Sequence, residues 1–299
     1  MTGPAPQVSG TDHRFPGLDG KVAVVVGGAG GGVGTACVEL LANSGAHVVV
    51  ADHNAERLEA LADRLPGAVT PISADVTTDE GIAAIDAVTA RKPPSALINV
   101  VGGVTPEEVG HFLDTTPAQW QRSLDLNLTY AMRTCQVVAR RMSTAQLPGS
   151  IVSLSVADAR GAMPWFSSYG AARSGLEALT RTMAVELGPL GIRANTVAWG
   201  LINSPRAHSG TGSDADLEKE LIPLGRRGTV GEVANTVLFL LSDFGAYVTG
   251  QCVVVDGGLL LRSSHYGAYD NLPAFLEAKP ARDRLRSRFE TLVNRTIGR

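Results

Sequence analysis

Four residues combine side-chain types and spacing that suit proton transfer. Tyr169 and Arg173 lie four positions apart at the start of a helical pattern, so their side chains share one face of that helix. A guanidinium close to a phenol favours the phenolate, which suits a tyrosine to general acid/base chemistry. Ser155 ends a central apolar run, and Asn127 lies in the Asp-Leu-Asn segment of a long helical pattern. Together the four residues indicate a site for acid/base catalysis.

A glycine-rich turn near the start of the chain has the composition of a phosphate-binding loop. The apolar run 22–26 leads into it, a helical pattern begins at Val33, and the glycines between them that fit G-x-x-x-G-x-G are Gly28, Gly32 and Gly34. Glycine lets backbone amides approach a pyrophosphate, and the helix start offers unpaired N–H groups. Asp52 ends the next strand pattern, about 20 residues on, where a ribose diol needs an acceptor. These features predict a dinucleotide site.

The elements that must position these residues alternate along the chain. Parallel strands that are covered on both faces read as continuous apolar runs, and seven such runs occupy residues 22–26, 47–51, 69–74, 96–101, 151–154, 194–198 and 252–255. Helical patterns occupy residues 33–44, 55–65, 79–90, 117–142, 169–187 and 230–241. Thr78 is the expected N-cap of the third helix. The alternation predicts an α/β protein, a single doubly wound Rossmann-type domain with a seven-stranded parallel sheet flanked by helices.

Length, composition and charge narrow the class of protein. The chain has 299 residues, of which 44% are hydrophobic and 18% charged, and its net charge is −3. This charge predicts no attraction to nucleic acid or to an acidic membrane, and no apolar run approaches the roughly 18 residues of a membrane-spanning helix. The three cysteines are far apart, without metal or redox spacing; they are Cys37, Cys135 and Cys252. We therefore expect a cytoplasmic protein without a metal site.

The chain divides into three predicted parts. Residues 1–17 are expected to form a mobile tail, residues 18–259 the nucleotide-binding catalytic domain, and residues 260–299 a C-terminal extension. Within the extension, one helical stripe is apolar; it consists of Leu285, Phe289, Leu292 and Val293. A basic amphipathic helix of this kind can meet a membrane or nucleic acid, but packing on this subunit or on a neighbouring one is the interpretation we prefer.

Two further segments leave their interpretation open. The polar segment 203–216 follows a strand, and it is either a lid over the site or a plain surface loop. Trp165 and Phe166 come just before Tyr169, and they either line an apolar pocket or pack in the interior.

These motifs, in this order and spacing, resemble the short-chain dehydrogenase/reductase family across about residues 18–258. Beyond the glycine turn, Asp52, Asn127, Ser155 and the Tyr169–Arg173 pair, the resemblance is carried by further short segments. They are Asp75-Val76, Asn99-Val100-Val101-Gly102, the stretch from Gly200 to Pro205, and Asp256-Gly257-Gly258.

The resemblance implies a role for each matching residue. Those implied to bind the cofactor are Gly28, Gly32, Val33, Gly34, Asp52, Asp75, Val76, Asn99, Gly102, Tyr169, Arg173, Gly200, Ile202 and Ser204. Ser155 would hold the substrate oxygen, and Tyr169 would pass the proton as hydride moves to or from nicotinamide. Arg173 would grip the nicotinamide ribose, and Asn127 would help to hold a relay water.

Several residues depart from the family pattern. Arg173 stands where the family has lysine, and arginine can grip the ribose but does not release its proton. Trp199 replaces the usual proline before Gly200. Ser155 lies 14 residues before Tyr169, one more than usual, so Ser153 is a second candidate.

The sequence therefore predicts an NAD(H)-dependent oxidoreductase that interconverts a small-molecule secondary alcohol and a ketone. Asp52 would repel the 2′-phosphate of NADP, so NAD is the expected cofactor. Because of Arg173, two alternatives stay open: a dinucleotide-binding protein with little redox turnover, and a non-redox lyase or isomerase on the same fold. The resemblance also implies a homo-oligomer, a tetramer or a dimer, paired through helices 117–142 and 169–187.

Overall fold

The computed structural model describes residues 15–205 and 221–261. Its main sheet consists of β1 (Val22–Val26), β2 (His47–Asp52), β3 (Val69–Ser73), β4 (Ala96–Asn99), β5 (Gly149–Val156), β6 (Ile192–Trp199) and β9 (Cys252–Val255). The helices are α1 (Val33–Asn43), α2 (Ala55–Arg64), α3 (Asp79–Arg91), α4 (Pro117–Leu124), α5 (Tyr130–Thr144), α6 (Ser167–Leu187) and α8 (Val230–Leu241). A second, two-stranded sheet pairs β7 (Ile202–Asn203) with β8 (Gly228–Thr229).

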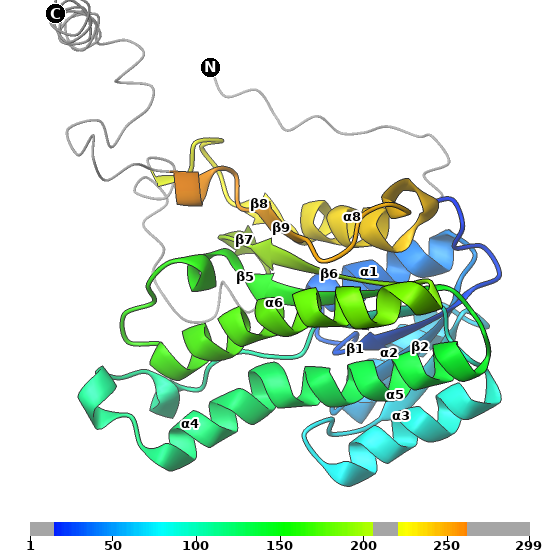
Figure 1. Cartoon of the computed structure of the whole chain (residues 1–299), viewed down its shortest axis with the longest axis horizontal. Coiled ribbons are helices and arrows are strands. Elements are labelled where there is room, and N and C mark those ends of the chain that lie inside the picture. The colour runs from blue at the N-terminus through cyan, green and yellow to red at the C-terminus, as the bar shows by residue number, and fades with distance from the viewer. Residues whose placement is uncertain (1–14, 206–220, 262–299) are drawn as a thin grey trace, which may run out of the picture.

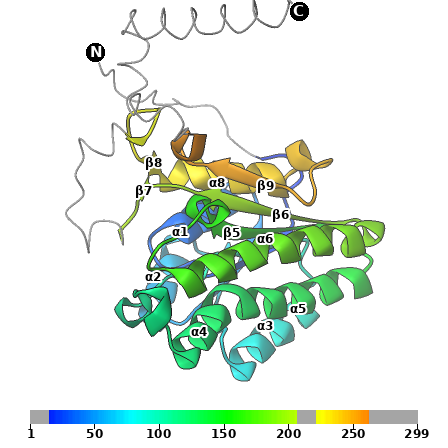
Figure 2. The ribbon, with the colours of Figure 1, turned by 60° about the vertical axis from the view of Figure 1, so that its left-hand side comes forward.

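The seven main strands are all parallel and lie in the order β3-β2-β1-β4-β5-β6-β9. The strand order reverses between β1 and β4, as it does in doubly wound sheets. Figure 1 shows α3, α5 and α6 in front of the sheet, and Figure 2 shows α8 on its other side. The predicted fold is confirmed.

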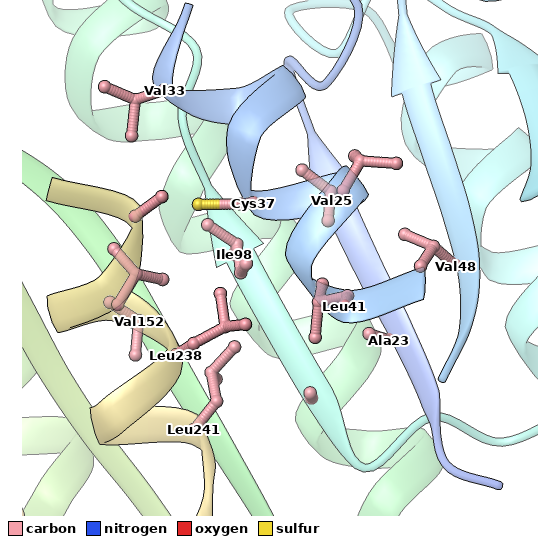
Figure 3. Packing of buried hydrophobic residues seen from close by; sticks show 14 of the residues in the cluster. Ala23, Val25, Val33, Cys37, Leu41, Val48, Ile98, Val152, Leu238 and Leu241 are labelled. Carbon is pink, nitrogen blue, oxygen red and sulfur yellow. The ribbon is translucent and has the colours of Figure 1, made fainter. Parts of the chain in front are cut away.

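Two hydrophobic cores explain why the strands are continuous apolar runs. Val24 and Val26 of β1 pack with α3, α5 and α6, whereas Ala23 and Val25 pack on the opposite face with α1, α2 and α8. Figure 3 shows the core between the sheet and helices α1 and α8, in which Cys37 and Leu41 of α1 face Leu238 of α8. Because both faces of these strands are buried, polar and apolar residues do not alternate along them.

The thiols of the two fully buried cysteines belong to these cores. Burial raises the pKa of Cys37 above its usual range and that of Cys135 to about 12. Both therefore behave as small apolar side chains. Within the described chain, every helix is too short or too polar to cross a bilayer.

Several boundaries differ from the prediction by one or two residues; β4, for example, ends at Asn99 and not at residue 101, and β5 spans Gly149–Val156 and not residues 151–154. The helix predicted at residues 117–142 is α4 and α5, separated by a π turn at Asp125–Thr129. Phe15 packs against the core that contains α1, and its N–H donates to the Ser44 hydroxyl. Thr78 caps α3 as predicted, accepting from the Gly81 N–H.

Most of the predicted tail and C-terminal extension, and residues 206–216 of the segment offered as a lid, lie outside the described residues.

Candidate functional site

The predicted site residues gather at the edge of the sheet where the strands end. The glycine turn follows β1, Asp52 ends β2, Asn99 ends β4 and Gly200 follows β6. Because the strands are parallel, their carboxyl ends lie along one edge, at the left in Figure 1, and α6 begins at the same edge. Ligands of doubly wound sheets bind along that edge, at the point where the strand order reverses.

The glycine turn has room for an anion and no room for larger residues beneath it. A Cβ at Gly34 would lie 2.2 Å from the Gly27 carbonyl oxygen, and one at Gly28 would lie 2.5 Å from Val50 Cγ1. Positions Gly30 and Gly32 face open space. The turn is therefore packed on its inner side and open on its outer side.

The start of α1 leaves its N–H groups available. No side chain of the described residues caps α1, whereas Asn54, Thr78, Thr116 and Thr229 cap α2, α3, α4 and α8. Unpaired N–H groups and the helix dipole favour an anion at this place. The turn and the helix start together fit the pyrophosphate of a dinucleotide.

Asp52 connects the end of β2 to the glycine turn. Its Oδ2 accepts from the Ala29 N–H at 3.0 Å, and its Oδ1 accepts from the Asn54 N–H at 3.2 Å. The carboxylate is 8% exposed, so it is fixed in place beside the turn. Each oxygen has further lone pairs, which leaves Asp52 able to accept from a ribose diol.

Asp75 and Val76, which the resemblance implies bind the cofactor, follow β3 and are fixed locally. Asp75 is exposed, and the Thr77 hydroxyl and N–H both donate to its Oδ1, which lowers the pKa of the carboxyl. Val76 is buried beneath it in the core with α3.

Tyr169 and Arg173 meet as their spacing predicts, but Arg173 turns inward. The Arg173 guanidinium carbon lies 5.4 Å from the centre of the Tyr169 ring. Its Nη1 donates to the Leu154 carbonyl at 2.8 Å and its Nη2 to the Val101 carbonyl at 3.4 Å. The side chain is 2% exposed, and its Nε has no partner among the described residues. The positive charge therefore lies between the ends of β4 and β5.

Gly102 makes this position of Arg173 possible. A Cβ on Gly102 would lie 1.7 Å from Arg173 Nη2 and 2.6 Å from Asn127 Oδ1, and the φ of Gly102 is +147°. An L side chain fits neither the space nor the backbone conformation. The role of Gly102 is thus steric, in addition to the cofactor contact implied for it.

Asn127 lies in the π turn and is fully buried. Its Oδ1 accepts from the Gly103 N–H, and its Nδ2 donates to the carbonyls of Gly103 and Ser123. The amide fixes the backbone that follows β4, next to Arg173. Its implied contact with a relay water stays a prediction.

The two candidate serines have partners inside the domain. The Ser155 hydroxyl is fully buried and donates to Glu177 Oε1 at 3.1 Å, and Ser153 accepts from Asn99 Nδ2 at 3.2 Å. Glu177 lies two helical turns beyond Tyr169 on α6, about 12 Å along the helix. The structure thus brings Tyr169, Arg173, Asn127 and Gly102 together and directs Ser155 to Glu177.

Glu177 is a buried residue that the sequence analysis did not identify. It is 8% exposed and also contacts Arg160, whose Nη1 lies 3.3 Å from its Oε2. Its spacing from Tyr169 and Arg173, at i+8 and i+4, places all three on one side of α6. That spacing is the signal that could have revealed it.

The segment after β6 is held by backbone contacts. The Gly200 N–H donates to the Val255 carbonyl, and a Cβ there would lie 2.7 Å from Asp256 Cβ. Ile202 is buried in β7, and Ser204 lies just before the gap in the described residues. Trp199 packs against the core with α1 and α8.

Comparison with known proteins agrees with this geometry. Residues 28–260 match the family model described as enoyl-(acyl carrier protein) reductase. D-erythrulose reductase of Gallus gallus is 35% identical over 247 residues, which cover 81% of this chain and 96% of the relative. The chain belongs to the short-chain dehydrogenase/reductase family.

Other comparisons support the same assignment. The 3-oxoacyl-[acyl-carrier-protein] reductase of Thermotoga maritima is 34% identical, with 82% of this chain and 99% of the relative covered. A crystal structure of a short-chain dehydrogenase/reductase from Burkholderia thailandensis superposes with a TM-score of 0.74 at 30% identity, covering 83% of this chain and 96% of that one. Homologues of this family are oxidoreductases that act on CH–OH groups, and the family uses nicotinamide dinucleotides, NAD or NADP.

Proposed function

We propose that the protein is an NAD(H)-dependent oxidoreductase that interconverts a secondary alcohol and a ketone, with Tyr169 as general acid/base. The observation that carries the proposal is the placement of Tyr169. Its half-buried phenol begins α6 at the edge that carries the glycine turn, and the Arg173 charge lies 5.4 Å from its ring. Acid/base group and dinucleotide site thus share one edge of the sheet.

When bound, the nicotinamide supplies or accepts the hydride. The start of α1 would hold the pyrophosphate, and Asp52 would accept from the adenosine ribose. The Tyr169 hydroxyl gives its proton to the carbonyl oxygen during reduction, and during oxidation the Tyr169 phenolate takes the proton of the alcohol.

Arg173 acts on the phenol through its charge alone. Held by the carbonyls of Leu154 and Val101, the guanidinium places its positive charge 5.4 Å from the centre of the Tyr169 ring. A guanidinium does not release its proton. The proton that Tyr169 gives up must therefore be replaced from water or from another group.

We also propose NAD over NADP as the cofactor, because the fixed carboxylate of Asp52 lies beside the turn and would repel a 2′-phosphate. Assembly as a homo-oligomer and location in the cytoplasm stay predictions from the sequence.

One observation favours a second candidate, a dinucleotide-binding protein with little redox turnover. Ser155 donates to Glu177, and Arg173 donates to two backbone carbonyls. The family resemblance implies that Ser155 contacts the substrate oxygen and that Arg173 contacts the nicotinamide ribose. With these internal partners, both contacts would be missing.

Two measurements separate these candidates. Calorimetric titration with NADH measures cofactor binding. Turnover is measured by absorbance, with a panel of secondary alcohols in the presence of NAD⁺ and a panel of ketones in the presence of NADH. The oxidoreductase proposal predicts both binding and turnover. Tight NADH binding without turnover across a broad panel favours the second candidate.

A further inference from the structure

Three exposed apolar side chains at the site edge have no role in the function proposed above. Phe112 and Leu113 lie in a 3-10 turn (Phe112–Asp114), and Trp165 precedes α6; we call these three residues the apolar rim. Their exposed fractions are 70%, 80% and 58%. The two aromatic side chains alone expose roughly 250 Å². Exposed apolar side chains that lie together are a feature of binding sites, whereas singly scattered ones are not.

The two segments of the apolar rim are tied to each other. The Gly110 N–H donates to the Trp165 carbonyl at 3.0 Å, and the rings of His111 and Trp165 meet edge to face with centres 6.0 Å apart. The Thr115 and Ser167 hydroxyls form a second tie at 3.3 Å. The rim is thus one connected feature, formed by the chain after β4 and the chain before α6.

Trp165 adopts a backbone conformation that its side chain disfavours. Its φ is +72°, in the left-handed region that bulky L residues rarely occupy. Because the indole is 58% exposed, burial of the ring does not offset this strain. Strain of this kind clusters at ligand-binding sites, where it persists because the position of the side chain matters.

Several polar groups beside the rim have partners within the chain. His111 Nδ1 accepts from the Leu113 N–H, and Glu108 accepts from the Thr105 N–H and lies 3.4 Å from Arg122. Thr115 and Ser167 are paired as well, and the exposed side chains of the turn are Phe112, Leu113 and the Asp114 carboxylate. The Phe112, Leu113 and Trp165 side chains cannot replace the hydrogen bonds that the hydroxyls of a polyhydroxylated ligand make with water, whereas an apolar group that packs on them loses none.

We propose that the apolar rim binds the apolar portion of the substrate, so that the alcohol or ketone carries an aromatic, alicyclic or alkyl group and not a polyhydroxylated chain. This inference rests on the proposed function. Trp165 lies four residues before Tyr169 in the sequence, just before α6, whose first turn contains Tyr169. A group bound on the rim would extend from a carbonyl carbon held at Tyr169.

The test is the variant Trp165→Gly, because glycine adopts a φ of +72° without strain. Its melting temperature should equal or exceed that of the wild type. With 4-phenyl-2-butanone and NADH, its kcat/KM should fall at least about tenfold. The wild type should prefer 4-phenyl-2-butanone over erythrulose by at least about tenfold in kcat/KM. A wild type that prefers erythrulose, or a variant with unchanged kcat/KM, overturns the inference.

A binding measurement keeps the test independent of turnover. The affinity for 4-phenyl-2-butanol in the presence of NADH, measured by calorimetry, should weaken at least about tenfold in Trp165→Gly. A tenfold weaker affinity supports substrate binding by the apolar rim even if the enzyme turns over neither ketone. In that case only the proposed function fails. Unchanged affinity together with an altered mass by light scattering would identify the rim as a subunit contact and overturn the inference.

Phe244→Ala provides the matched control. Phe244 is 65% exposed in the turn after α8, which leads to the start of β9 and hence to the opposite edge of the sheet. Its removal deletes a similar apolar area and should leave kcat/KM and the alcohol affinity unchanged.

Discussion

Replacing Gly102 by alanine tests the buried position of Arg173. The new Cβ would lie 1.7 Å from Arg173 Nη2, so the guanidinium has to move. Losing its charged hydrogen bond to Leu154 costs about 1.5–3 kcal/mol, and a non-glycine residue at φ +147° adds about 1–3 kcal/mol. We therefore expect Gly102→Ala to lower the free energy of unfolding by about 2.5–6 kcal/mol, which corresponds to a melting temperature roughly 5–20 °C lower.

A double-mutant cycle with Arg173→Lys isolates the steric part. Lysine lacks the Nη2 that meets the new methyl group, so the double variant should lose at least about 1 kcal/mol less than the sum of the single variants. The assay is chemical or thermal unfolding followed by circular dichroism. Gly188→Ala is the control, because Gly188 has helical φ and ψ and open space around it. If Gly102→Ala costs under about 1 kcal/mol, or if the two changes are additive, Arg173 does not occupy the position described.

Further predictions concern turnover, cofactor choice and acid stability. Arg173→Lys should retain or raise kcat, since lysine can release a proton; a kcat loss above about a hundredfold would contradict the account of Arg173 as a charge. Asp52→Asn keeps the shape of the side chain and removes its charge, so the ratio of NADH to NADPH affinity should fall at least about tenfold, as read by calorimetry; an unchanged ratio would count against Asp52 as the selector. Arg226 lowers the pKa of Glu232 from 4.5 to about 2. The Glu232 carboxylate therefore stabilises the fold above about pH 4.5 and loses this effect as the pH falls towards 2. Because both side chains are 43% exposed, Glu232→Gln should cost at most about 1 kcal/mol at pH 7; the difference in melting temperature from the wild type should vanish near pH 2, and a difference that grows with acid would refute this.

Strand positions were the most predictable part of the structure. The runs 22–26 and 252–255 coincide with β1 and β9, because a strand buried on both faces leaves an uninterrupted apolar signature. The two-residue strands β7 and β8 are too short to produce a pattern. The π turn between α4 and α5 was equally invisible, since one extra residue in a helix barely alters the hydrophobic period.

The candidate site was predicted in outline and not in its contacts. Helical spacing was enough to place Tyr169 beside Arg173. It could not show that Arg173 turns inward to Leu154 and Val101, because backbone carbonyls carry no sequence signal. Ser155 was chosen by its place at a strand end, yet its hydroxyl points to Glu177 from a helix distant in the sequence. Such pairings depend on how α6 packs on β5, which local patterns do not encode.

The central claim is that Tyr169 exchanges the proton while the dinucleotide site binds NAD(H) independently of it. The most direct test compares wild type and Tyr169→Phe for the rate of NADH consumption with a ketone substrate, alongside the Kd for NADH. We predict that kcat falls by about 10²–10⁴ while the Kd for NADH stays within about twofold, because the phenol acts on the substrate oxygen. Turnover by Tyr169→Phe at the wild-type rate would contradict the account.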